Sequence, residues 1–188
     1  MMATILMPAK ANGIDLNALG LMVEAIKSDP VEARVEFRVR TGWTGGTRSE
    51  TVVDSYVLGG ETFARRFKIV ADEPLELCGS NTAPNPQELL MAAVNACMIV
   101  GYVANAALRG INLSSLEIEM HGELDLRGFL GLDEAVAPGY HVIDYTVRVD
   151  GDGSDALYQE VHEAVMRTSP NYFNMARPIR MNGRLEPM

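Results

Sequence analysis

The chain has 188 residues, 47% of them hydrophobic, and a formal net charge of −9. This length and composition predict a globular protein with one substantial core and exclude a disordered chain. Because contact with phosphate groups needs clustered positive charge, the acidic balance argues against a nucleic-acid partner and against binding to an anionic membrane surface.

The first 30 residues are expected to form an extension that precedes the main domain. The start, MMATILMPAKANG, lacks basic residues followed by a long apolar run, so we expect no signal peptide and a cytoplasmic location with reduced thiols. Residues 1–12 are expected to be a loose tail. Residues 15–27 carry apolar side chains at helical spacing, which predicts an amphipathic helix capped by Asp15. We therefore assign residues 1–30 to a tail and an extra helix, and residues 31–188 to a single domain.

Alternating apolar and charged side chains predict a first group of strands. These strands are expected at residues 31–40, 47–58 and 63–71. Gly42 to Gly46 is expected to break the first strand, with Trp43 inside the turn, and Gly59-Gly60 marks a hairpin. Residues 74–86 then form a loop.

Residues 85–109 form the longest apolar stretch of the chain. Asn85 at the N-cap and Glu88 three residues later predict a capping box, while Gly110 and Ile111 predict the helix end. Because the apolar residues run all round this helix, it must be covered on every side, by a bilayer or by protein.

A cover of protein is the interpretation we adopt for this helix. Asn95 and Asn105 argue against a bilayer, because an amide in hydrocarbon needs a partner. A stripe of small side chains also recurs at helical spacing and allows a close approach of another element. The stripe consists of Ala93, Cys97, Gly101 and Ala104.

The remaining chain predicts two clear strands, a helix and a short last strand. The strands are expected at residues 116–126, 140–149 and 178–185, with an irregular crossover at 127–139, a helix at about 155–167 and a turn or short helix from Ser169-Pro170. Strands in runs between helices predict an α+β fold with mostly antiparallel strands.

The sequence offers no metal or cofactor motif. Asp150 to Gly153 resembles the start of a calcium loop, but Asp155 and Val161 stand where that loop needs glycine and glutamate. The three histidines lack metal-ligand spacing with one another and with the cysteines. We therefore expect neither a metal nor a cofactor.

Cys97, in the middle of the long helix, can be read as a small core side chain or as a nucleophile. A nucleophile must be a thiolate, and the helix dipole gives little help three turns in. A guanidinium would have to stabilise the thiolate, and Arg38, Arg40 and Arg48 of the first hairpin are the candidates.

Two stretches carry a resemblance to a known family. The stretch Asn85-Pro86-Gln87-Glu88-Leu89-Leu90, followed by Ala96-Cys97, and the earlier Trp43-Thr44-Gly45-Gly46 resemble the signature of the osmotically inducible protein C and organic hydroperoxide resistance (OsmC/Ohr) family. The likeness covers roughly residues 31–185. It implies an intertwined homodimer, with antiparallel sheets wrapped around two central helices per subunit.

The resemblance also implies a reaction, the reduction of organic hydroperoxides by a reactive cysteine that a second cysteine resolves. Cys97 aligns with the reactive cysteine, whereas Ser169 stands in the position of the resolving one. Gln87, with Glu88 beside it, replaces the glutamate of the family. Arg48 lies one residue beyond the position of the active-site arginine, and one residue reverses the face of a strand.

Two functional hypotheses follow. In the first, the protein is a thiol-dependent peroxidase of atypical mechanism in oxidative-stress defence, with Cys97 as nucleophile, Arg48 or Arg38 stabilising its thiolate, and Cys78 or an external thiol reductant resolving it. In the second, it is a non-catalytic protein that binds a small hydrophobic ligand in an apolar groove around Cys97 at the dimer interface. Cys78, in the loop before the long helix, either resolves Cys97 or fills space.

Overall fold

The computed structural model describes residues 10–187 of the chain, which divides into two compact units, one up to Ala92 and one from Ala93 onward. The division falls within the long helix α2 (Pro86–Leu108). Each unit combines helices with antiparallel strands, so the predicted α+β class is confirmed. The assignment of residues 31–188 to one domain stays a prediction.

The first unit begins with a hairpin and a helix. The strands β1 (Lys10–Ala11) and β2 (Ile14–Asp15) pair antiparallel, and α1 (Leu16–Ser28) follows them directly. The Asp15 carboxylate accepts hydrogen bonds from two backbone amides at the start of α1, as the sequence predicts. The expected loose tail at residues 1–12 is wrong for Lys10 and Ala11, because Asn12-Gly13 adopts positive φ and closes a hairpin; residues 1–9 lie outside the described residues.

A twisted sheet forms the rest of the first unit. It contains β3 (Val35–Phe37), β4 (Arg40–Gly45), β5 (Arg48–Leu58) and β6 (Glu61–Ala71). The long strand β5 pairs antiparallel with β6 along one edge and with β3 and β4 along the other. The two later strands and the hairpin at Gly59-Gly60 confirm the prediction, and both glycines have positive φ.

The first predicted strand, residues 31–40, is wrong at its start. Pro30 to Ala33 form a short 3-10 helix, because the Asp29 carboxylate accepts the amide of Val31 and Pro30 fixes a helical φ. The predicted turn is also misplaced. Strand β4 continues to Gly45, and Trp43 lies within it and donates from its indole to the carbonyl of Gly46 at 2.8 Å.

The predicted capping of α2 is confirmed at both ends. The Asn85 side chain accepts from the amide of Glu88 at 2.8 Å, and the Glu88 carboxylate accepts from the amide of Asn85 at 2.8 Å. At the other end Gly110 takes φ +72° and the amide of Ile111 donates to the carbonyl of Ala106, which closes a Schellman motif. Before α2, the loop contains a short 3-10 helix, η2 (Leu75–Leu77).

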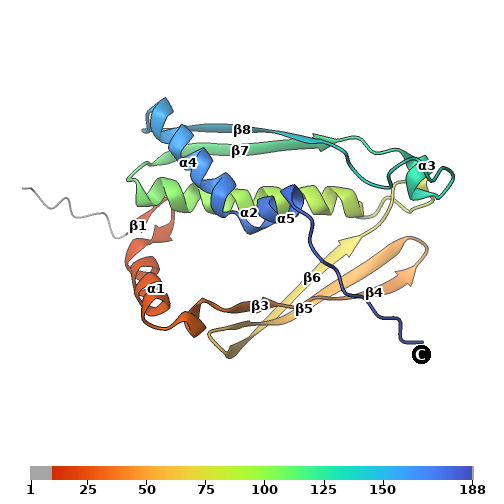
Figure 1. Ribbon diagram of the computed structural model, residues 1–188, viewed down its shortest axis with the longest axis horizontal. Helices are drawn as coiled ribbons and strands as arrows, with labels where there is room; N and C mark the ends of the chain where they lie inside the picture. Colours follow the sequence, from red (N-terminus) through yellow and green to blue (C-terminus); the bar gives the residue numbers. More distant parts are fainter. Residues whose placement is uncertain (1–9, 188) are drawn as a thin grey trace, which may run out of the picture. The chain divides into compact units, whose positions relative to one another are not determined.

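The second unit is a hairpin covered by helices. The strands β7 (Leu113–Gly122) and β8 (Ile143–Gly151) pair antiparallel, with Ile118 opposite Val147. A crossover that contains α3 (Leu126–Phe129) joins them, and α4 (Asp155–Thr168) and α5 (Pro170–Ala176) follow. In Figure 1 the hairpin runs alongside α2, and α4 crosses the same helix.

Two strand predictions in this unit need correction. The strand expected at residues 116–126 ends at Gly122, because Asp125 accepts the amide of Arg127 and starts α3. Residues 178–185 form no strand, since no described strand pairs with them, and a strand without a partner leaves its backbone groups unsatisfied. The predicted helix at 155–167 and the short helix after Ser169 are confirmed.

The core of the second unit joins one face of α2 to the hairpin and to α4. Its buried residues are Val94, Met98, Tyr102, Ala106, Ile111, Ile118, Val161 and Val165. By length and composition alone α2 would also suit a membrane span, a test that the core helix of a water-soluble protein passes as well. One face of α2 packs into this core, and 22% of its most apolar 18-residue window is buried.

Candidate active site

Cys97 lies on the face of α2 that meets the junction of α4 and α5. The thiol is half-buried, and the Ser169 hydroxyl donates a hydrogen bond to its sulfur across 3.4 Å. Ser169 is only 4% exposed. The structure therefore brings together two of the residues that the sequence singled out, and it places a hydroxyl donor directly on the sulfur.

The position of Ser169 follows from two helix ends. It is the C-cap of α4, where its amide donates to the carbonyl of Val165 at 2.8 Å, and the N-cap of α5, where its hydroxyl accepts from the amide of Tyr172 at 3.4 Å. Pro170 then occupies the first position of α5. Because the hydroxyl oxygen accepts from Tyr172, its single proton is available for the sulfur of Cys97.

The stripe of small side chains on α2 explains how the junction of α4 and α5 comes so close to Cys97. The Asn171 side chain donates to the carbonyl of Ala93 at 2.8 Å, one turn before Cys97. One turn after it, a Cβ on Gly101 would meet the methyl groups of Val165 at 3.3 Å. The stripe predicted from Ala93, Cys97 and Gly101 is thus a surface that packs against α4 and α5.

Arg48 belongs to a polar network in the first unit. Its guanidinium donates to the Thr82 hydroxyl at 2.6 Å, and that hydroxyl donates to the Asp72 carboxylate at 2.8 Å. Asp72 is 1% exposed and also accepts from the Thr47 hydroxyl and from the amides of Glu73, Ser80 and Thr82. These hydrogen bonds, led by the hydroxyls of Thr47 and Thr82, hold the pKa of Asp72 far below its usual range.

This network orders the loop that leads into α2. The amide of Asp72 donates to the carbonyl of Pro84, which closes the loop at its base. Gly79 packs so tightly against the backbone of Glu73 that a Cβ would lie 1.8 Å from its carbonyl oxygen. Cys78, at the tip of η2, is exposed and takes the left-handed conformation at φ +64°, which is unusual for a residue with a side chain.

The other residues proposed for the site have different surroundings. Glu88 is engaged in the capping box of α2, and Gln87 is half-buried in the first turn of that helix. The Arg38 side chain is 81% exposed and pairs with Glu36 at 2.9 Å, and Arg40 lies 3.5 Å from Asp54. Cys78, Gln87, Glu88 and Arg48 belong to the first unit, and Cys97 and Ser169 to the second.

Comparison with known proteins now identifies the family. The model of the family described as OsmC-like protein matches residues 79–182, more than half of the chain. The chain belongs to this OsmC-like family. The matched range contains Cys97 and Ser169, whereas Arg48 and Cys78 lie before it. No curated protein matches the sequence.

Solved structures agree on the OsmC-like fold. An OsmC-like protein from Mycoplasma pneumoniae superposes with a TM-score of 0.59 at 13% identity, over 75% of this chain and 87% of that one. A candidate osmotic stress induced and detoxification response protein from Psychrobacter arcticus 273-4 gives 0.56 at 14%, over 72% and 85%. An OsmC-like protein of unknown function from Vibrio cholerae gives 0.52 at 15%, over 73% and 92%.

The structure also shows residues that the sequence did not single out. Asp72 follows a strand and precedes a loop rich in polar residues, a pattern too common to mark a buried carboxylate. Tyr102 and His162, which share a hydrogen bond in the second unit, lie 60 positions apart and carry no spacing signal. Among residues 10–187, no three His, Cys, Asp or Glu side chains are grouped so as to hold a metal ion.

Proposed function

We propose that this OsmC-like protein is a cysteine-based peroxidase for organic hydroperoxides, active in stress defence in the cytoplasm. The observation that carries the proposal is the hydrogen bond from the buried Ser169 hydroxyl to the sulfur of Cys97. A hydroxyl donor on sulfur stabilises the thiolate, which is the nucleophilic form. Family membership and the similarity to the osmotic stress induced and detoxification response protein of Psychrobacter arcticus support the setting in stress and detoxification.

The reaction is a two-electron oxidation of sulfur. The Cys97 thiolate attacks the terminal oxygen of the hydroperoxide, so that a sulfur–oxygen bond forms and the peroxide bond breaks. The alkoxide leaves and takes a proton to become an alcohol, and Cys97 becomes a sulfenic acid. Two external thiols complete the cycle: the first displaces water to give a mixed disulfide, and the second releases Cys97 as the reductant's disulfide forms.

The atypical feature of this cycle is its resolution. A serine hydroxyl cannot form a disulfide, so Ser169 holds and polarises the sulfur without resolving it. The half-buried thiol of Cys97 leaves the sulfenic acid open to a small thiol from solution. Cys78, exposed at the tip of its loop, is the alternative thiol within the chain.

A cation must also stabilise the Cys97 thiolate, and for this role we propose Arg48, which donates to Thr82, as the neighbour in the active protein. Gln87 and Glu88 at the start of α2 are the flanking polar groups that we propose.

The experiment is consumption of cumene hydroperoxide with a monothiol and with a dithiol as reductant. Wild-type protein should turn over with either reductant, Cys97→Ser should be inactive, and Cys78→Ser should keep activity if an external thiol resolves Cys97. Absence of turnover with both reductants, together with protection of Cys97 from alkylation by an apolar ligand, would instead establish a non-catalytic binding protein.

A further inference from the structure

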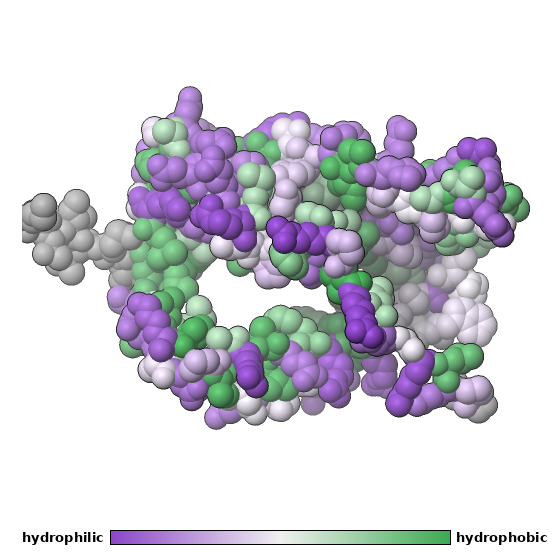
Figure 2. All heavy atoms as spheres, viewed as in Figure 1, coloured by the Kyte–Doolittle hydropathy of each residue, from purple (hydrophilic) through white to green (hydrophobic). Residues whose placement is uncertain are grey.

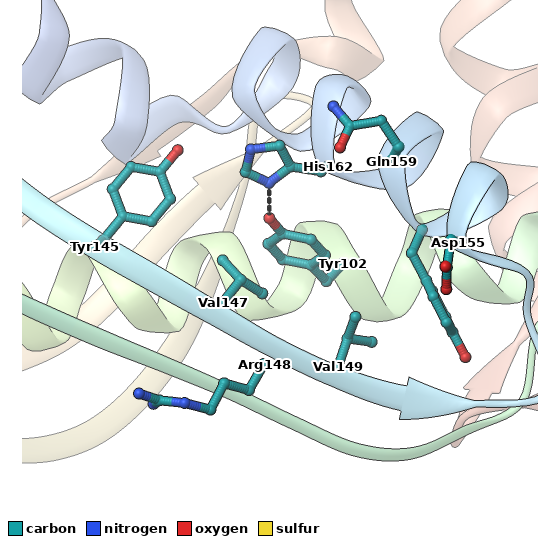
Figure 3. Close-up of a pocket in the computed structure, with 9 residues that line it drawn as sticks. Tyr102, Tyr145, Val147, Arg148, Val149, Asp155, Gln159 and His162 are labelled. Atoms are coloured by element: carbon teal, nitrogen blue, oxygen red, sulfur yellow. Dashed lines mark hydrogen bonds between the residues drawn. The ribbon is translucent and has the colours of Figure 1, made fainter.

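A groove of about 680 Å³ runs between β8 and α4 in the second unit. Tyr145, Val147 and Val149 line it from the strand, Tyr158 and His162 line it from the helix, and Tyr102 of α2 lines it as well. Figure 3 shows Tyr145, Val147 and Val149 on the strand, His162 on α4 and Tyr102 on α2 around this groove. Cys97 and Ser169 are not among the lining residues, so the groove is separate from the candidate active site.

At the floor of the groove, the hydroxyl of Tyr102 and Nδ1 of His162 share a hydrogen bond. Tyr102 is 3% exposed, and this burial is the main cause that raises the pKa of its phenol well above the usual value. The phenol therefore keeps its proton, and a buried hydroxyl proton needs an acceptor. Tyr102 is accordingly the donor and Nδ1 of His162 the acceptor.

This hydrogen bond fixes the histidine tautomer. A neutral imidazole that accepts at Nδ1 carries its proton at Nε2, so His162 offers an N–H donor from its second nitrogen. In Figure 3 that nitrogen is turned to the side on which Tyr145 lies. The groove thus presents one oriented donor between aromatic and aliphatic walls.

One carboxylate and one guanidinium belong to residues that line the groove, and the guanidinium is already paired. Asp155, the first residue of α4, lines it with a carboxylate. Arg148 is the only cation among the lining residues, and its guanidinium is bound to Glu117 and Glu119 at 2.7 Å each. The carbonyl oxygen of Gln159 adds an acceptor, since its amide nitrogen donates to Glu163 at 3.2 Å. Carboxylate and tyrosine faces together attract a cation.

We propose that this groove binds a small aromatic amine. The ring packs against Tyr145 and Val147, a polar atom on the ring accepts from Nε2 of His162, and the ammonium group lies beside Asp155. The inference goes beyond the peroxidase proposal and does not depend on Cys97.

The test is a calorimetric titration of the full-length protein with two probes that share a phenol ring, tyramine and 4-hydroxyphenylacetate. Tyramine carries an ammonium group where the second probe carries a carboxylate. We expect tyramine to bind at least tenfold more tightly. Asp155→Asn should weaken tyramine binding about tenfold, and His162→Gln should weaken both probes.

Two control variants distinguish binding in the groove from a general effect of charge and from binding at the candidate active site. Glu160→Gln removes one negative charge from the same helix at a residue that does not line the groove, and it should leave tyramine affinity unchanged. Cys97→Ser should also leave it unchanged, whether or not the peroxidase proposal holds. Equal affinity for the two probes, no binding of tyramine, or equal effects of Asp155→Asn and Glu160→Gln would overturn the proposal.

Discussion

At the scale of single residues, the function rests on what Ser169 does to Cys97. Ser169→Ala removes the donor on sulfur, and a hydrogen bond to a charged group contributes about 1.5 kcal/mol or more. We therefore expect the rate of Cys97 alkylation by iodoacetamide at pH 7 to fall about tenfold. Ser154→Ala is the matched control, because Ser154 is the N-cap of α4 and accepts from Leu157 without contacting Cys97. An equal loss of alkylation rate in the two variants would show that capping, not the contact with sulfur, matters.

The same pair of positions allows a gain-of-function test. The hydroxyl oxygen of Ser169 lies 3.4 Å from the sulfur of Cys97, so Ser169→Cys places a second thiol beside the first. Peroxide treatment should then give a disulfide between positions 97 and 169 and raise turnover with dithiol reductants. Peptide mapping under non-reducing conditions detects this disulfide. Two thiols that both remain free after treatment would contradict the arrangement of α4 and α5 against α2.

Asp72 makes a prediction about pH. Its pKa is lower in the folded protein than the usual 3.8, so the stability it contributes is complete above pH 4 and is lost as pH falls through the lowered value. Asp72→Asn should lower Tm at pH 7, and the difference from wild type should shrink progressively from about pH 4 downward. Thermal melts at pH 7, 4 and 2.5 measure this. A difference that is constant across the three values would refute the role of the charge.

The sequence predicted the identity of the candidate site residues better than it predicted the contacts between them. Cys97 and Ser169 were singled out through the family resemblance, yet the direct contact between them depends on how a helix junction packs. Asp72 escaped prediction because its burial depends on hydrogen bonds from Thr47, Ser80 and Thr82, which lie 8 to 25 positions away and form no sequence pattern with it.

At the scale of elements, Gly20 of α1 and Gly101 of α2 provide a pair for comparison. A Cβ on Gly101 meets Val165, whereas a Cβ on Gly20 of α1 meets nothing within 4 Å. Gly20→Ala should stabilise the protein by up to about 1 kcal/mol through helix propensity. Gly101→Leu should destabilise it by about 1–3 kcal/mol or more, because it overpacks the crossing of α2 and α4. Urea unfolding of both variants decides this, and an unchanged midpoint for Gly101→Leu would show that the stripe does not pack.

Elements with strong end signals were predictable, whereas the last expected strand, which has no partner strand, was not. The capping box of Asn85 and Glu88 and the Schellman glycine at 110 are local, so the bounds of α2 followed from the sequence. The strand expected at 178–185 has the right composition, but strand formation needs a neighbouring backbone. The turn after β4 lies later than predicted, because the chain reverses at Gly46-Thr47 and not at Gly42.

At the scale of the whole molecule, the exposed apolar surface predicts a partner. No residue of the strands β3 to β6 is buried, and large apolar side chains are exposed on them. Phe37 is 70% exposed and Trp43 is 78% exposed. The face of α2 that carries Val100 is exposed as well. Figure 2 shows apolar side chains at the surface of the first unit. Surfaces of this extent are rare in monomers and mark an interface.

We therefore expect an obligate homodimer that buries well over about 2,000 Å² in total, as obligate interfaces do. Size-exclusion chromatography with light scattering at micromolar concentration should give twice the chain mass, and dilution should not release a folded monomer. A folded monomer at these concentrations would contradict the expectation.

The peroxidase proposal is tested most directly by mass spectrometry of reduced protein after one equivalent of cumene hydroperoxide, with dimedone present. We predict a dimedone adduct on Cys97, or a Cys78–Cys97 disulfide that Cys78→Ser converts into that adduct. Because Ser169 cannot resolve the sulfenic acid, the Cys78→Ser variant should accumulate it in near-stoichiometric amount. Cys97 that stays reduced under excess peroxide would contradict the account.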